Sequence, residues 1–462
     1  MDSVTQIKEY GIVGAGGAGF PTHVKLGSQA EIVIVNAAEC EPMLHKDKEI
    51  LKQRTDIFFR GLTALIAATG AKTCIIGIKE KHHTLIEMLN TKSGDNIKVV
   101  PIRDFYPAGD EITLIYETTG RVIEAGKLPI TQGVIVNNVE TIYNIGAEKP
   151  VTTKFLNFAG EVKKRVTVEV PLGISFRELI DFAEPLIDDY VLLVGGPMMG
   201  KLVDDLDEVV TKTTAALILL PPDHCLVRHY RVMASESAVN KIGKSACDQC
   251  TMCTELCPRY LLGHPVQPHK AMMSLVFTDE TGETTEPGTH ALSCCECNLC
   301  SFVSCPEGLY PSTVTVNTKR KAMLKKLSYE GEPLNRAHAL ADYRRTPSRR
   351  LKNMLDLNRY PDEGPLVEFD RKPATLKILL HQHIGAPATP LVKEGDLVTV
   401  EQKVATPGKN LGAEIHSPVN GRVERVTDTF IQICCVEQSC VEQSCVEQKQ
   451  NCCVEQNKIG GQ

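Results

Sequence analysis

The chain has 462 residues, of which 42% are hydrophobic and 23% are charged, a composition typical of a folded protein of about three domains. Its 51 lysines and arginines against 57 aspartates and glutamates give a net charge of −6, which disfavours nucleic acid as a partner. The longest apolar run, residues 215–220, is far shorter than the ~20 residues of a membrane-spanning helix, and the N-terminus lacks the features of a secretory signal. We therefore expect a cytoplasmic protein with no transmembrane segment.

The first 150 residues alternate strand-like and helix-like stretches. β-Branched runs at 31–37, 72–78 and 97–102 have the length of buried strands, and 47–69 has the apolar periodicity of a helix. This alternation predicts an α/β domain with a mostly parallel sheet. Residues 151–225 differ, because an alternating strand, an amphipathic helix and a further strand follow one another. We expect a small α+β domain there.

The strongest chemical signal lies between residues 240 and 330. Eighteen cysteines in a chain without an export signal indicate metal or redox chemistry rather than disulfides. Two sets have the C-x2-C-x2-C-x3-C-P spacing of bacterial ferredoxins, the second with one extra residue before its last cysteine. The first set is Cys247, Cys250, Cys253 and Cys257, and the second is Cys294, Cys297, Cys300 and Cys305.

In two-cluster ferredoxins, three thiolates of one set bind a cluster and the fourth ligand comes from the other set. The predicted ligands are Cys247, Cys250, Cys253 and Cys305 for cluster one, and Cys294, Cys297, Cys300 and Cys257 for cluster two. Cys295 remains unused. A pair of structural zinc sites is the alternative, but such sites usually consist of two separated C-x2-C pairs. We therefore predict two [4Fe–4S] clusters in a domain spanning 240–330.

The last part of the chain has three sections. Residues 331–371 are polar and rich in arginine, which predicts a linker with solvated side chains. Residues 372–434 contain short strand-like stretches with glycine turns, which predict a compact β-sandwich or barrel. Residues 435–462 repeat the sequence Cys-Val-Glu-Gln without the proline and spacing of the central sets, so a metal-binding role is disfavoured there. The repeat begins where the last strand should end, so we expect a marginal C-terminal domain.

Near the N-terminus, residues 14–19 satisfy the G-x-G-x-x-G pattern, which alone is a weak signal. The strand-like stretch before the pattern is short, and Phe20-Pro21 follows at once, unlike a regular dinucleotide-binding turn. Backbone amides of such a loop can still bind a phosphate, and Lys25 is near enough to add charge.

Four segments in order resemble the flavoprotein subunit of respiratory complex I, which binds FMN and accepts hydride from NADH. GAGGAGFPTHVK at 14–25 resembles its flavin-binding glycine loop, and VNAAECEP at 35–42 resembles its acidic flavin-site strand. Gly-Asp-Glu at 109–111 lies where the family has Gly-Glu-Glu, and VNNVET at 136–141 resembles its Asn-Asn-Val-Glu-Thr segment. An ordered set of this kind is more specific than one glycine loop.

The resemblance implies an FMN site with NADH as the electron donor. The implied cofactor-binding residues are Gly14, Gly16, Gly17, Phe20, Lys25, Asn36, Glu39, Glu41, Gly109, Asp110, Glu111, Asn137, Asn138 and Thr141. Gly16, Gly17 and Lys25 would hold the phosphate and ribityl region, whereas Glu41 and Glu111 would face the nicotinamide. The asparagines, Glu39 and Thr141 would line the flavin. Taken singly, each residue could have a structural role instead, in a tight turn or as a partner of buried backbone groups.

Three features depart from the complex I pattern. Phe20 matches one aromatic residue of the nicotinamide pocket, but the position of a second is near Gly27 or Ser28. Ala15 stands where that family has arginine, and residues 121–129 lack an obvious basic, proline-rich segment of the kind that helps to hold NADH. FMN is therefore better supported than NADH, and another protein could be the electron donor.

Domain order narrows the resemblance. Residues 151–225 look like a β-grasp-type SLBB domain, and 372–434 like the barrel-sandwich domain of the Rnf complex C subunit, in which that domain comes first. The order found here, with the barrel sandwich last, is similar to the cobalamin reductases of propanediol-utilising bacterial microcompartments. We therefore expect a multidomain α/β protein that passes electrons from NADH through FMN and two [4Fe–4S] clusters to cobalamin.

The same resemblance implies a place in the cytoplasm, within a microcompartment. A corrinoid adenosyltransferase and a shell protein would be its partners. Two other functions remain open: an Rnf-like subunit of a membrane-bound electron-transport complex, against which the domain order argues, and an electron-transfer module fed by a protein donor.

Overall fold

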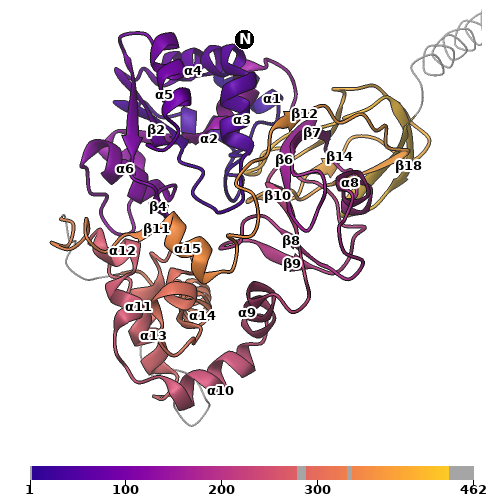
Figure 1. Ribbon diagram of the computed structural model, residues 1–462. Helices are drawn as coiled ribbons and strands as arrows, with labels where there is room; N and C mark the ends of the chain where they lie inside the picture. The colour runs from indigo at the N-terminus through magenta and orange to yellow at the C-terminus, as the bar shows by residue number, and fades with distance from the viewer. Residues whose placement is uncertain (1–2, 278–287, 330–335, 436–462) are drawn as a thin grey trace, which may run out of the picture.

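The computed structural model describes residues 3–277, 288–329 and 336–435. In Figure 1 the N-terminal α/β part, the short helices of the central part and the β-rich remainder form three lobes around a common centre. Among the described helices, none is both long and apolar enough to cross a membrane.

A four-stranded parallel sheet forms the centre of the N-terminal lobe, with the strand order β3-β2-β1-β5. Its strands are β1 (Ile32–Ala37), β2 (Thr73–Lys79), β3 (Ile97–Ile102) and β5 (Val134–Asn138). Val33 of β1 packs in the core that contains Phe58, whereas its neighbour Ile34 packs in the core that contains Leu114. The sheet is thus apolar on both faces, as parallel sheets are, and the predicted α/β domain is confirmed.

Helices cover both faces of this sheet (Figure 1). The elements are α1 (Ser3–Glu9), α2 (Thr22–Leu26), α3 (Lys46–Gln53), α4 (Thr55–Thr69), β4 (Phe105–Tyr106), α5 (His83–Lys92), α6 (Glu111–Thr119), η1 (Pro129–Gln132) and α7 (Val139–Gly146). The single helix expected at 47–69 is two helices, because Arg54 leaves the helical conformation between them with a φ of −126°. Helices α4 and α7 cross closely, since a Cβ on Gly61 would lie 2.0 Å from the carbonyl oxygen of Ile142.

A six-stranded mixed sheet follows, with the order β12-β7-β6-β10-β8-β9. Its strands are β6 (Thr153–Gly160), β7 (Thr167–Pro171), β8 (Val191–Val194), β9 (Lys201–Val203), β10 (Ala216–Leu220) and β12 (Leu366–Val367). Helix α8 (Phe176–Ala183) begins at Ser175, whose side chain accepts a hydrogen bond from the Glu178 amide, and it buries one apolar face. This is the α+β arrangement that the pattern of 151–225 predicts, completed by one strand from much later in the chain.

Short helices and turns carry the two cysteine sets in the lower lobe of Figure 1. They are α9 (Cys225–Met233), α10 (Glu236–Ala246), α11 (Met252–Glu255), α12 (Pro258–Leu261), α13 (Pro268–Ser274), η2 (Gly288–Ala291), η3 (Cys300–Ser304) and α14 (Pro311–Leu324). The cysteines lie in the loops that join these helices or at the helix ends.

The segment predicted as a solvated linker is packed where the structure describes it, at residues 336–371. β11 (Thr346–Pro347) pairs with β4, α15 (Ser348–Met354) follows, and β12 pairs with β7. Leu351 and Leu357 are fully buried in a core that also contains Phe302 of the cysteine-bearing lobe. The prediction of a linker was wrong because the arginines of this segment masked the apolar side chains among them in the sequence. Arg345 is not solvated, as it stacks over Phe105 and pairs with Glu117.

The C-terminal lobe consists of two facing sheets, with the orders β13-β19-β18-β15 and β14-β16-β17. The strands are β13 (Thr375–Leu379), β14 (Thr389–Pro390), β15 (Leu397–Val398), β16 (Lys403–Thr406), β17 (Ile415–His416), β18 (Gly421–Val426) and β19 (Phe430–Cys435). β19 pairs with β13 and β18, so Cys434 and Cys435 complete the last strand. The repeat tail was predicted at 435–462, but its first residue, Cys435, belongs to β19, and residues 436–462 lie outside the described residues.

Leu351→Ala tests the packing of α15. Removing this fully buried side chain should cost about 2–5 kcal/mol and lower the midpoint of thermal unfolding. Met354→Ala is the matched control on the same helix, because Met354 is 43% exposed and its loss should change little. Equal midpoints for the two variants, measured by circular dichroism, would show that the segment is a linker after all.

Candidate functional site

The glycine loop is held by hydrogen bonds at both ends. The Gly14 amide donates to the Phe20 carbonyl at 3.0 Å and closes the loop. The Ala15 amide donates to Thr141 Oγ1 at 2.9 Å, which ties the loop to α7. The Ala18 carbonyl accepts a hydrogen bond at 2.9 Å from the amide of Ile384 in the C-terminal lobe.

Between these anchors, the amides of Gly16 and Gly17 have no hydrogen-bond partner among the described residues. A Cβ on Gly16 would lie 2.8 Å from the Asn138 side chain, whereas one on Gly17 would meet nothing within 4 Å. The loop therefore presents free donors beside open space, which is how backbone cradles bind phosphate groups. Lys25 lies near, with its amine 3.2 Å from the Val136 carbonyl and 3.4 Å from Glu111.

The two asparagines at the end of β5 have different surroundings. Asn138 caps α7, because its Oδ1 accepts from the Glu140 amide at 3.0 Å while its Nδ2 donates to Asp47 at 2.6 Å. Asn137 is 5% exposed, and its Nδ2 has no partner. An unpartnered buried amide is costly, so Asn137 fits a residue that binds a polar cofactor. Together with the free loop amides, it makes the site suitable for FMN.

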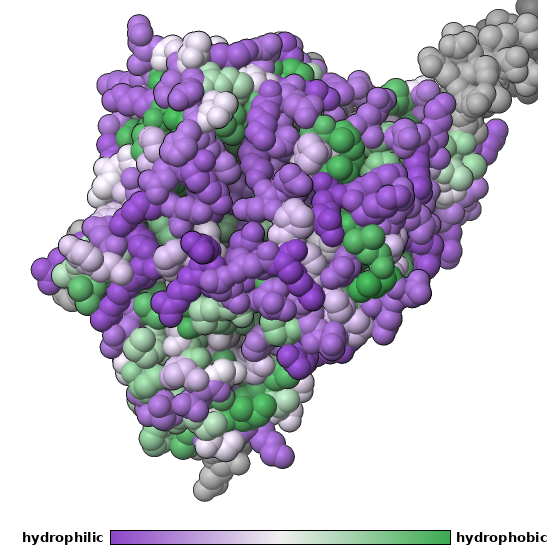
Figure 2. Space-filling view, viewed as in Figure 1, coloured by the Kyte–Doolittle hydropathy of each residue, from purple (hydrophilic) through white to green (hydrophobic). Residues whose placement is uncertain are grey.

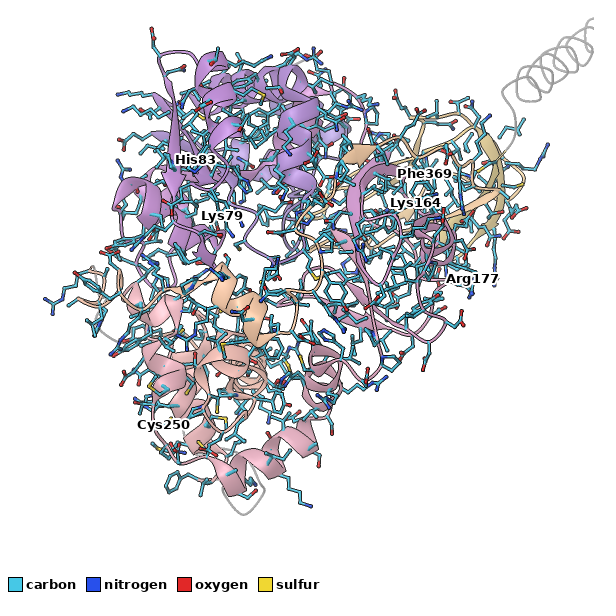
Figure 3. All side chains as sticks on the ribbon, viewed as in Figure 1. Lys79, His83, Lys164, Arg177, Cys250 and Phe369 are labelled. Carbon is cyan, nitrogen blue, oxygen red and sulfur yellow. The ribbon has the colours of Figure 1, made fainter. Side chains whose placement is uncertain are left out.

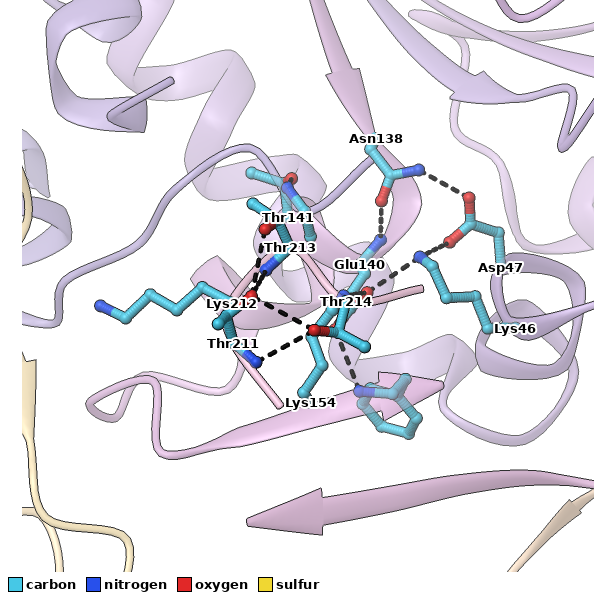
Figure 4. A network of polar contacts seen from close by, with 12 residues as sticks. Lys46, Asp47, Asn138, Glu140, Thr141, Lys154, Thr211, Lys212, Thr213 and Thr214 are labelled. Carbon is cyan, nitrogen blue, oxygen red and sulfur yellow. Dashed lines mark hydrogen bonds and ion pairs between the residues drawn. The ribbon is translucent and has the colours of Figure 1, made fainter. Parts of the chain in front are cut away.

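Glu140, which we did not single out from the sequence, is the centre of a buried charge network (Figure 4). It is 1% exposed and pairs with Lys46 at 2.9 Å and with Lys154 of β6. Lys46 also pairs with Asp47 at 2.6 Å. Burial alone would raise the pKa of Glu140, but the two lysines lower it below its ordinary value. The network joins the N-terminal lobe, which carries the glycine loop and is the flavin-type lobe, to the six-stranded sheet next to Asn138.

Two predicted acidic residues lie on the loop after β1. Glu39, with a φ of +36°, accepts from the Asp47 amide at 2.9 Å and so caps α3. Burial raises its pKa to about 7, with a further rise from Asp47. Glu41 accepts from the Met198 amide at 2.9 Å through one oxygen, while the other oxygen is buried without a partner. Burial raises the pKa of Glu41 to about 7.

The Gly109–Glu111 segment serves two purposes. A Cβ on Gly109 would lie 3.0 Å from Cys40 Sγ, and its carbonyl accepts from Asn36 Nδ2 at 2.8 Å, so glycine is required by close packing. Asp110 is not open to a ligand. It caps α6 and forms a two-pronged ion pair with Arg259 at 3.0 and 2.6 Å. Glu111 is 40% exposed and faces Lys25.

Tyr106 is a second residue that the sequence reasoning missed. It is 1% exposed, lies next to Glu41, and donates from its hydroxyl to the Cys297 carbonyl at 3.1 Å. Asn298 adds a parallel link, since its Nδ2 donates to the Met198 carbonyl at 2.5 Å. The flavin-type site and the second cysteine set are therefore in direct contact. The place of Tyr106 before cis-Pro107 could not be recognised from the sequence.

The four cysteines predicted for cluster one surround one hollow. Cys247, Cys250, Cys253 and Cys305 all line a space of about 320 Å³. The grouping includes Cys305 from the second set and leaves out Cys257 of the first, as the crossed arrangement requires.

The second group is more deeply buried. Cys257, Cys297 and Cys300 are 8–9% exposed, and burial together with the neighbouring thiols raises the pKa of each well above its ordinary value. Cys294 and Cys295 both lie close to Cys257. Cluster binding needs thiolates, so loading these sites must release protons.

Backbone conformation distinguishes Cys294 from Cys295. In the first loop Gln249 and Thr251 have φ values of 61° and 66°, and in the second loop Glu296 and Asn298 have 61° and 59°. The two loops thus have the same turn pattern, in which Cys294 matches Cys247 and Cys295 matches Asp248. This supports Cys294 as the ligand. Within the described chain, no three His, Cys, Asp or Glu side chains are grouped for a single metal ion.

Comparisons with known protein families match three parts of the chain. Residues 7–147 match the Nuo51 FMN-binding domain, 246–310 match a 4Fe-4S dicluster domain, and 362–448 match the RnfC barrel sandwich hybrid domain. The FMN-binding and two-cluster domains expected from the sequence are confirmed.

Whole-chain relatives are more specific. Cobalamin reductase PduS of Salmonella typhimurium is 41% identical over 93% of this chain and 95% of its own length. The PduS of Citrobacter freundii is 40% identical over the same shares. The chain belongs to the PduS family of cobalamin reductases. Family membership covers all three described lobes and confirms the resemblance seen in the sequence.

More distant relatives of this PduS-family chain match in part. The C component of the proton-translocating ferredoxin:NAD(+) oxidoreductase complex of Clostridium ljungdahlii is 31% identical over 55% of this chain and 55% of its own length. Among solved structures, an NAD+-reducing [NiFe]-hydrogenase in the air-oxidized state aligns with a TM-score of 0.47 and 21% identity, over 77% of this chain and 66% of that one.

Cys257→Ala tests the crossed arrangement. The variant should lose the cluster that Cys297→Ala also loses, because both thiols face the same group, and bound iron should fall by half. Electron paramagnetic resonance of the reduced protein should show the same remaining signal in both variants and the other signal in Cys253→Ala. A Cys257→Ala spectrum that matches Cys253→Ala would contradict crossing.

Glu41→Gln tests the buried carboxyl. Because the folded pKa of Glu41 is raised from 4.5 to about 7, the folded state binds its proton more tightly than the unfolded state. The wild type should therefore lose stability as pH rises through this window, by about 1.4 kcal/mol per pH unit, and then level off. The Gln variant should show a flatter stability profile between pH 4.5 and 7 in thermal unfolding of the apoprotein. Glu111→Gln, at a half-exposed site, is the control, and a Glu41→Gln profile parallel to it would refute the assignment.

Proposed function

We propose that this protein is an NADH-dependent cobalamin reductase that passes electrons through FMN and two [4Fe–4S] clusters to the cobalt of a corrinoid. The observation that carries the proposal is the similarity to the PduS cobalamin reductases, which spans 93% of the chain and includes both cofactor-binding parts. When bound, FMN accepts an electron pair with a hydride and releases electrons singly, and each cluster carries one.

The residues of the flavin-type site would bind FMN and orient it. The free amides of Gly16 and Gly17, with Lys25, would hold the phosphate and ribityl region, and the unpartnered Asn137 amide would donate to a polar atom of the cofactor. Glu41 exists partly as the neutral acid near neutral pH, so it can donate as well as accept a hydrogen bond. Glu39 and Asn138 are held by the helices that they cap, so they would support the site through its shape.

Contacts between the lobes would keep the path between the sites short and dry. Tyr106 is buried at the junction, where it holds the Cys297 loop against the flavin-type site. The Asp110–Arg259 pair, with side chains 9% and 16% exposed, holds helix α12, which follows Cys257, against the same lobe. The first set lies farther out, since Cys250 is exposed. We therefore infer that the side of cluster one bearing Cys250 faces the electron acceptor.

We further propose a cytoplasmic location within a bacterial microcompartment. A corrinoid adenosyltransferase would take the reduced corrinoid, and a shell protein would hold the reductase. The family relationship to PduS supports this setting.

A second candidate is an electron-transfer module that a protein donor reduces. It is favoured by the absence of an obvious basic, proline-rich segment at residues 121–129. This candidate keeps the FMN and cluster chemistry and changes only the donor.

Anaerobic titration with NADH tests the proposal. The flavin absorbance should bleach, and the signals of reduced clusters should follow. Added cob(III)alamin should then form two cob(II)alamin for each NADH consumed, because a hydride carries two electrons and this reduction of cobalt takes one. A loaded protein that dithionite reduces and NADH does not would exclude NADH as the donor. Reduced protein that leaves cob(III)alamin unchanged would exclude the acceptor.

A further inference from the structure

A second hollow lies beside the flavin-type site and is lined by none of the glycine-loop residues. It lies between the loop after β1, the end of β2 and helix α15. Its basic or hydroxyl-bearing side chains are Lys48, Lys79, Lys81, His82, Ser348 and Lys352. Figure 3 shows Lys79 where the N-terminal lobe meets α15. The carboxyl ends of parallel strands are where open α/β sheets bind their ligands.

Only part of the positive charge in this hollow is neutralised closely. Asp104 pairs with Lys79 at 2.7 Å and with Lys81 at 3.0 Å. Ser348 completes this arrangement, since it lies 3.0 Å from Lys79. The amine of Lys48 forms no ion pair or hydrogen bond within the described part of the chain, although the carboxylates of Glu39 and Asp362 lie near enough to act on its pKa. Glu39 and Glu41 also line the hollow. A half-buried amine without a partner favours an anion from outside the protein.

Asp362 approaches the same hollow without making a close contact. Its carboxylate lies 3.7 Å from Lys352, 3.8 Å from Lys81 and 3.9 Å from His45. These distances exceed hydrogen-bond length, and the Asp362 side chain is 47% exposed. Exposed ion pairs of this kind contribute little to the stability of the fold. A stronger anion can therefore replace the Asp362 carboxylate with little loss of free energy.

We propose that this hollow binds the phosphate groups of a nucleotide, with Lys48, Lys81 and Lys352 as the residues that contact them. Lysine amines are common phosphate ligands, and several converging amines suit the charge of a pyrophosphate better than that of a carboxylate. Asp362 occupies the place of the anion when no ligand is bound. The hollow also borders Glu41, so a nucleotide held here lies beside the flavin-type site.

Two sources could supply this chemistry: the pyrophosphate of the NADH donor, or a separate nucleotide that regulates the enzyme. Only the first source rests on the proposed function. It would also explain how the protein holds a dinucleotide without a basic segment at 121–129.

Calorimetric titration of the oxidised holoprotein with inorganic pyrophosphate tests the proposal without any electron transfer. The wild type should bind saturably, and Lys48→Gln and Lys352→Gln should each weaken binding about tenfold. Asp362→Asn should bind more tightly, because it removes the competing carboxylate. Lys92→Gln is the control, because Lys92 lies on α5 in an exposed pair with Asp56 and should not affect binding. Unchanged flavin and cluster spectra would show that each variant is folded and loaded.

Absence of saturable binding by the wild-type holoprotein would overturn the proposal. Equal binding by Lys48→Gln, Lys352→Gln and Lys92→Gln would overturn it as well. Displacement of pyrophosphate by NADH would assign the hollow to the donor, whereas displacement by ADP with NADH ineffective would assign it to a separate nucleotide. If NADH fails to reduce the flavin and pyrophosphate still binds, the proposed donor is wrong and the phosphate site stands.

Discussion

The arrangement of this protein depends on the contact between Tyr106 and the Cys297 carbonyl, with the Asp110–Arg259 ion pair beside it. Tyr106 joins the end of β4 to the loop of the second cysteine set, and Asp110 joins the start of α6 to helix α12, which follows Cys257. Tyr106 is buried, and the Arg259 and Asp110 side chains are only 16% and 9% exposed, so solvent weakens these contacts little and a missing partner is costly. A loop held in this way has little freedom to move away from the flavin-type site. Electron transfer between separate cofactors requires such fixed spacing.

On the other side of the flavin-type lobe, buried charged groups also fix the position of one part of the protein against another. Glu140 and Asp47 balance Lys46 and Lys154 in a region from which solvent is excluded. Such networks add little net stability compared with apolar packing, but removal of one member leaves a buried charge without a partner. Their value here is positional: Asp47 orients Asn138, and Lys154 brings the six-stranded sheet against the end of β5. The surface in Figure 2 shows the contrast, since polar side chains cover most of the visible face and apolar ones form separate patches.

The features that the sequence could predict have local chemical patterns. Cysteine spacing gave the two clusters, and the turn pattern shared by the loops at Gln249 and Glu296 agrees with it. The glycine loop and the Asn-Asn segment were recognisable because close approach to a cofactor limits their residue types. What could not be predicted depends on distant contacts. Tyr106 belongs to no local motif, and Glu39 proved to cap a helix. The apolar face of α15 was hidden among arginines, of which Arg345 has its partners far away in the chain.

The return of residues 346–367 to the two earlier sheets has a consequence for how the protein is made. β11 and β12 pair with β4 and β7, which leave the ribosome long before them. Leu351 and Leu357 likewise close a core whose other side includes Phe302. During synthesis, the cysteine-bearing segment therefore emerges before the element that covers it has been translated. The cover over the cysteine-bearing lobe is therefore completed only after residues 346–367 have been made.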